Sequence, residues 1–168
     1  MKLRDIDKSR YRKHLRVVFA GIVVMMITIS LVVSQLFIQF FSTADASHFY
    51  HNLAGVIVAG IITVLTLKRL RSHPYMDEVV YVWDLKYQLN RIYRKQHKIE
   101  PLLDDNHVNA MIIMNFMYRG SKQLYTLDDN TITIDALNLK LSGLEQRIKD
   151  ANLDISTDDY DQSLLEAF

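Results

Sequence analysis

Two small groups of histidine and aspartate residues are the strongest candidates for chemistry in this sequence. His48 and His51 are three positions apart, so they would share one helical face and could bind a metal ion between two copies of the chain. Asp104, Asp105 and His107 could form a carboxylate–imidazole site in a membrane-anchored enzyme. A histidine pair supplies only two metal ligands, and a helix cap explains the aspartates more simply. We therefore predict neither a metal site nor an enzyme.

Other catalytic patterns are missing from the 168 residues. The chain has no cysteine, which excludes disulfides, zinc thiolates, iron–sulfur clusters and a cysteine nucleophile. It has no Walker loop and no G-x-G-x-x-G, H-E-x-x-H or G-x-S-x-G pattern. The net charge is +1, whereas nucleic-acid-binding proteins usually carry a clear basic excess. We identify no catalytic residue, cofactor or small-molecule substrate, and we expect no nucleic-acid partner.

Two long stretches of the sequence contain no charged residue. No Asp, Glu, Lys or Arg occurs from Val17 to Ala44 or from Ala46 to Leu67. A helix rises about 1.5 Å per residue, and a bilayer core of roughly 30 Å needs about 20 residues. Helices over about 17–41 and 49–67 are therefore predicted to span a membrane. Burial of both helices in a small soluble protein is the weaker alternative.

The basic residues indicate how the two spans are oriented. Residues 1–16 contain seven Lys and Arg residues and two Asp residues. The connection 42–52 contains no Lys or Arg, and Lys68, Arg69 and Arg71 follow the second span. Basic flanks stay in the cytoplasm, so the short connection should face outward and the helices should run antiparallel.

A cleaved signal peptide is the alternative interpretation of the first span. Ala44-Asp45-Ala46 has the form of a cleavage site. However, the apolar run that precedes it is much longer than the roughly 7–15 residues of a signal peptide. We therefore expect the first span to be retained, and we expect residues 17–71 to form a transmembrane hairpin.

Polar and small residues form a stripe along each predicted span. Such residues let helices approach closely and satisfy polar groups in hydrocarbon, so we expect them to pack helix on helix, within or between chains. A solute or ion path is the weaker interpretation, because no ionisable residue lies in either apolar core. The stripe residues are Thr28, Gln35 and Gln39 on the first span and Gly55, Ala59 and Thr63 on the second.

The residues after the second span predict a cytoplasmic helical domain over 74–151. Amphipathic helices are expected at about 76–98, 107–125 and 133–151, separated by Pro101 and by the turn at 128–130. We expect this domain to fold on its own. Its expected core residues are Trp83, Ile112, Phe116, Leu137, Leu141 and Leu144.

The third of these helices carries a regular apolar seam. Its members recur at intervals of 3, 4, 3 and 4 residues, which is the pattern of a helix-packing face. Packing inside the domain is favoured over dimerisation. The seam consists of Ile134, Leu137, Leu141, Leu144 and Ile148.

The last segment, 152–168, has five acidic residues and no basic residue. It is expected to be a mostly flexible tail that could contact the basic segment 1–16.

The first 14 residues, MKLRDIDKSRYRKH, are followed at once by the apolar hairpin and the helical region. This arrangement resembles a family of small membrane proteins from Gram-negative bacteria, domain-of-unknown-function family 3087. The resemblance covers most of the chain. It implies an inner-membrane location and brings no established activity.

The sequence thus predicts an all-α membrane protein in which an antiparallel two-helix transmembrane hairpin precedes a small cytoplasmic helical bundle. We expect a multi-pass protein of the bacterial inner membrane with both termini cytoplasmic. The leading hypothesis is non-enzymatic: the helical domain mediates interaction with a protein partner or with a second copy of the chain. A small oligomeric channel or transporter subunit is the alternative.

Overall fold

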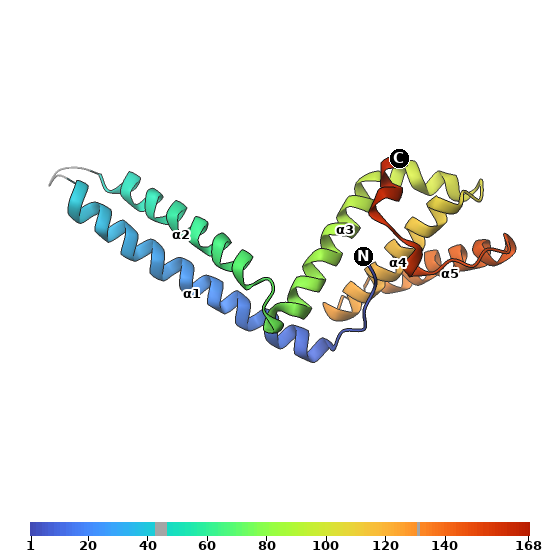
Figure 1. The fold of residues 1–168 in the computed structure, drawn as a ribbon, viewed down its shortest axis with the longest axis horizontal. Helices are drawn as coiled ribbons and strands as arrows, with labels where there is room; N and C mark the ends of the chain where they lie inside the picture. The colour runs from blue at the N-terminus through green and yellow to red at the C-terminus, as the bar shows by residue number, and fades with distance from the viewer. Residues whose placement is uncertain (43–46, 131) are drawn as a thin grey trace. The chain divides into compact units, whose positions relative to one another are not determined.

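The computed structural model describes residues 1–42, 47–130 and 132–168, and all regular structure in these ranges is helical (Figure 1). The fold is therefore all-α over the described residues, as the sequence predicts. The possible cleavage site Ala44-Asp45-Ala46 lies outside them. The helices are α1 Lys8–Phe41, α2 Phe49–Leu70, η1 Pro74–Met76, α3 Asp77–Ile99, η2 Glu100–Leu103, α4 Val108–Leu127, α5 Ile134–Asp150, η3 Thr157–Asp159 and η4 Gln162–Ala167.

The chain forms two compact units. The hairpin unit is Ser9–Val80, and the helical domain combines Met1–Lys8 with Tyr81–Phe168. These boundaries differ from the expected 1–16, 17–71, 74–151 and 152–168. The first eight residues and the acidic tail both belong to the helical domain, because each makes contacts there that are distant in sequence.

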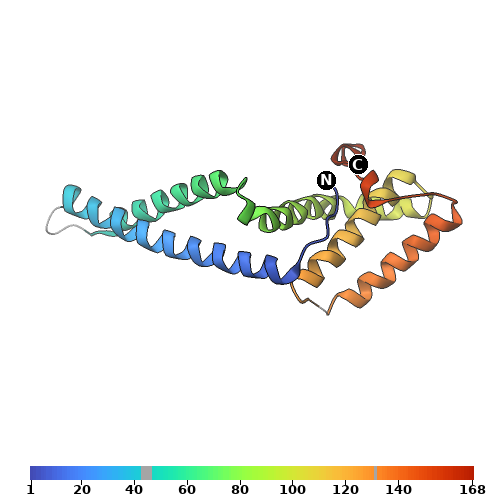
Figure 2. The same cartoon turned by 60° about the horizontal axis from the view of Figure 1, so that its bottom comes forward.

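In the hairpin unit, α1 and α2 lie side by side and run in opposite directions (Figures 1 and 2). Both helices are long and apolar enough to cross a membrane. Within the most apolar window of each, only 6% of α1 and 17% of α2 is buried inside the chain. Their apolar side chains are thus mostly exposed, unlike those of a core helix in a soluble protein.

The contact between the two helices is built on small residues. Gly55 and Ala59 of α2 are buried, and so is Ser34 of α1. A Cβ atom at Gly55 would come 2.8 Å from the carbonyl oxygen of Ser30 and closer still to the Ser34 hydroxyl. Thr63, also buried, donates its hydroxyl hydrogen to the Ala59 carbonyl at 2.8 Å and so needs no partner on α1.

Helix α4 is the centre of the helical domain. Met111, Met114 and Phe116 are fully buried, so the methionines of this helix fill the core. The helix continues through Gly120, where a Cβ atom would come 3.2 Å from side-chain carbons of Leu85 and Leu89 on α3. Glycine at this position lets α3 and α4 approach closely.

Helix α3 buries a different face from the one expected. Trp83 was expected in the core, but it is 36% exposed, and Tyr87 and Tyr93 are 62% and 68% exposed. The helix carries two apolar stripes, and the aliphatic one is buried. Its residues are Val79, Val82, Leu85, Leu89 and Ile92.

The acidic tail is packed, in contrast to the expected flexible segment. Tyr160 is 3% exposed and its ring stacks on Phe116 with centroids 4.1 Å apart. Leu165 is 1% exposed, and Lys95 donates to its carbonyl oxygen at 2.6 Å. A fragment ending at Ala151 would lack these two residues of the core, Tyr160 and Leu165.

The Gly55 contact predicts the effect of enlarging this residue. Gly55→Leu should overpack the helix contact and destabilise the hairpin unit by about 1–3 kcal/mol. Gly60→Leu is the matched control, because a Cβ atom there meets nothing within 4 Å. Thermal unfolding of the detergent-solubilised chain, followed by circular dichroism, compares the two variants. Equal melting temperatures would contradict a close contact at Gly55.

Candidate functional site

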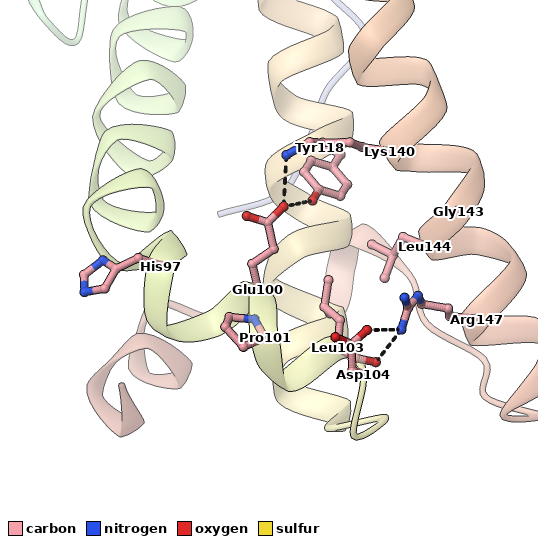
Figure 3. Close-up of a pocket in the computed structure, with 10 residues that line it drawn as sticks. All are labelled: His97, Glu100, Pro101, Leu103, Asp104, Tyr118, Lys140, Gly143, Leu144 and Arg147. Atoms are coloured by element: carbon pink, nitrogen blue, oxygen red, sulfur yellow. Dashed lines mark hydrogen bonds and ion pairs between the residues drawn. The ribbon is translucent and has the colours of Figure 1, made fainter.

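A charged cleft of about 530 Å³ opens in the helical domain between the end of α3, η2, α4 and α5 (Figure 3). It is lined by residues of both charge signs, which sets it apart from the apolar core behind it. The lining residues with charged or titratable side chains are His97, Glu100, Asp104, Tyr118, Lys140 and Arg147.

Glu100 is the residue that links the walls of this cleft. Its Oε1 accepts hydrogen bonds from Lys140 Nζ at 2.9 Å and from the Tyr118 hydroxyl at 3.3 Å. Its Oε2 accepts from Gln96 Nε2 at 3.0 Å. The hydrogen bond from Lys140 is the main cause that lowers the pKa of Glu100, and partial burial opposes it. One carboxylate thus joins α3, α4 and α5.

Tyr118 stays protonated in this arrangement. Burial, followed by the nearby Glu100 charge, raises the pKa of Tyr118 to about 12. At neutral pH the carboxylate is therefore ionised and the phenol neutral. Efficient general acid–base groups have pKa values near the working pH. The Glu100–Tyr118 hydrogen bond thus joins η2 to α4 as a contact between a carboxylate and a neutral phenol.

The structure does not assemble the carboxylate–imidazole site that was considered for Asp104, Asp105 and His107. Arg147 binds the Asp104 carboxylate at 2.8 Å. His107 instead caps α4, because its Nδ1 accepts from the Ala110 amide at 3.4 Å. His97 points away from the other labelled side chains in Figure 3. The imidazoles and carboxylates of this region thus have separate roles.

The other histidine pair lies at the start of α2. His48 and His51 have ring centroids 6.3 Å apart, and His48 Nδ1 lies 3.1 Å from the Ser42 hydroxyl. Among the described residues, no three His, Cys, Asp or Glu side chains gather as a metal site.

A second depression, of about 470 Å³, adjoins the charged cleft in the helical domain. Tyr118 and Lys140 line both. We call it the tyrosine groove, after Tyr93 and Tyr125 on its walls; Leu137 of the α5 seam also lines it. Sequence reasoning did not predict the groove, whose lining residues come from three different helices.

The residues predicted to pack lie on α1, α2 and α5, and only some of them are buried. Gly55, Ala59 and Thr63 are buried in the hairpin unit, but Thr28, Gln35 and Gln39 are exposed on the other side of α1. Packing of the α1 stripe within the chain is thus not observed, because Ser30 and Ser34 take that place against Gly55. The seam of α5 faces inward: Leu141 and Leu144 are buried, and Ile134, Leu137 and Ile148 are half-buried.

The lowered pKa of Glu100 gives a pH-dependent prediction. A carboxyl group with a lowered folded-state pKa stabilises the fold above its unfolded value, near 4.5, and loses that contribution as the pH falls through the folded value. Wild type should therefore lose more stability than Glu100→Gln between pH 7 and pH 3. Denaturant unfolding at several pH values measures this difference.

Glu145→Gln is the control for this experiment, because Glu145 forms an exposed pair with Arg119 at 2.7 Å. The assignment fails if the stability of Glu100→Gln falls in parallel with that of wild type.

The sequence of this chain is similar to a described protein family. No curated protein and no solved structure matches the sequence. The family described as protein of unknown function DUF3087 matches residues 1–165, which is nearly the whole chain. The match includes the basic N-terminal segment, the apolar hairpin and the helical domain with its packed tail. The chain therefore belongs to the DUF3087 family.

Proposed function

We propose that this chain is a non-enzymatic membrane protein, anchored by α1 and α2 in the bacterial inner membrane, whose cytoplasmic helical domain binds a protein partner. The exposed apolar surface of α1 and α2 supports the proposed membrane anchoring. Phe19, Leu31 and Phe40 of α1 are each more than half exposed, as are many neighbours. Apolar patches of this extent are rare on soluble monomers and suit a lipid environment.

Both ends of the chain are proposed to be cytoplasmic. Seven basic residues occur in 1–16, and Lys68, Arg69 and Arg71 follow the apolar part of α2. The charge rule for membrane proteins then places the connection between α1 and α2 in the periplasm.

The tyrosine groove supports the interaction role of the helical domain. Tyrosine is enriched at protein interfaces because it combines a large apolar ring with a hydrogen-bonding group. Here the exposed Tyr93 shares the groove with Met117 and Leu137, and the lysines that line it, Lys86 and Lys140, are paired with Asp128 and Glu100. Such a groove fits a partner segment that has an apolar anchor.

Self-association through α1 is compatible with the same role. Gln35 and Gln39 are exposed in the mainly apolar part of α1. Amide groups in hydrocarbon are stabilised by hydrogen bonds across helices, which a second copy could supply.

The same stripe supports the second candidate, a small oligomeric channel. Ion flux in liposomes that is lost in Gln35→Leu would favour the channel.

Topology is the first test. Reporters fused at Met1 and at Phe168 should both be active in the cytoplasm, and a tag inserted between Ser42 and Ser47 should be accessible from the periplasm. Alkaline carbonate should fail to extract the protein from membranes. A mature protein that begins at Ser47, or reporters on opposite sides, would overturn the proposed membrane arrangement.

The groove is tested by site-specific crosslinking in intact cells. A photoreactive amino acid in place of Tyr93 should give a discrete adduct, whose mass distinguishes a second copy from another protein. Leu139 is the matched control position, because it is 77% exposed on α5 and does not line the groove. Equal labelling from positions 93 and 139 would contradict the groove as an interface.

A further inference from the structure

We propose that the basic end of the α1–α2 hairpin holds an anionic phospholipid, with an acyl chain in an apolar groove and the headgroup on the flanking basic residues. This inference deepens the proposed function and rests on it, because it requires α1 and α2 to lie in a bilayer. The groove has a volume of about 390 Å³, within the usual range of ligand cavities. We call it the hairpin groove.

The walls of the hairpin groove are apolar and come from both helices. Ile22 and Met25 lie on α1, Leu67 and Leu70 on α2, and Tyr75 on η1. The groove also includes Gly21, where a Cβ atom would meet nothing within 4 Å. The missing side chain at Gly21 therefore leaves open space between the two helices. Thr66 and His73 also line the groove, but most of its wall is apolar. A hydrocarbon chain suits this space, because the apolar walls offer it dispersion contacts.

Charge complementarity selects the headgroup. Arg16 immediately precedes the lining residue Val17, and Lys68 and Arg69 lie next to Leu67 and Leu70. All three basic side chains belong to exposed residues. Basic residues between helices at the cytoplasmic side attract anionic headgroups, with a gain that corresponds to about fivefold in affinity per residue. A neutral lipid would fill the apolar groove and gain nothing from these charges.

The groove is fixed in shape by a contact at its edge. The ring of Tyr75 lies against that of His14, tilted by 31°, with centroids 3.9 Å apart. His14 is in turn held by the buried Glu78 carboxylate at 3.0 Å. Tyr75 is thus held in place before any lipid binds, which reduces the entropy cost of binding.

Native mass spectrometry of the detergent-purified full chain tests this inference. Phosphatidylglycerol and phosphatidylcholine with the same acyl chains are added separately, so that headgroup and chain contributions are distinguished. Wild type should retain phosphatidylglycerol preferentially. Gly21→Leu should lose most of this retention because its side chain occupies the groove, while Gly60→Leu, which also adds a leucine in open space but outside the groove, should behave as wild type.

The double variant Lys68→Gln and Arg69→Gln should lose the headgroup preference, by about fivefold for each charge removed. Circular dichroism of each variant controls for loss of fold. Equal retention of the two lipids by wild type, or unchanged retention by Gly21→Leu, would overturn the inference. So would a change in oligomeric mass in Gly21→Leu, since a second copy would then occupy the groove. A chain that stays soluble without detergent would instead refute the membrane proposal itself.

Discussion

The buried carboxylate of Glu78 is the interaction around which the start of the hairpin unit is organised. Its side chain is 9% exposed and is held by Arg10 Nε at 2.7 Å and His14 Nδ1 at 3.0 Å. A buried charge that loses one partner typically costs about 3–5 kcal/mol, so this carboxylate constrains its neighbours strongly. Since Arg10 and His14 are one turn apart on α1, they fix α1 against the first turn of α3. Both residues lie in the part of α1 that precedes its apolar stretch.

Sequence patterns predicted the features that depend on local composition. The two charge-free stretches became the apolar parts of α1 and α2, and α2 begins at Phe49 as expected. Pro101 and the 128–130 turn separate α3, α4 and α5 within two residues of the expected limits. These features follow from composition and helix-breaking residues, which act over a few positions only. The sequence also predicted the close approach at Gly55, because small residues on one face of a membrane helix are typical of helix contacts.

Features that depend on distant contacts were not predictable in the same way. Helix α3 offers two apolar stripes, and the one that is buried includes Leu85 and Leu89, which lie against Gly120 of α4. The acidic tail looked flexible because its charge outweighs its few apolar residues, yet Tyr160 finds Phe116 as a stacking partner. The charged cleft needed Glu100 and Lys140, 40 residues apart, to meet. No spacing rule links such pairs.

The Glu78 cluster and the hairpin groove meet at one side chain. Tyr75 lines the groove, and its ring centroid lies 3.9 Å from that of His14, which contacts the buried Glu78 carboxylate at 3.0 Å. The shape of the groove at this edge therefore depends on the same contact that joins α1 to the first turn of α3.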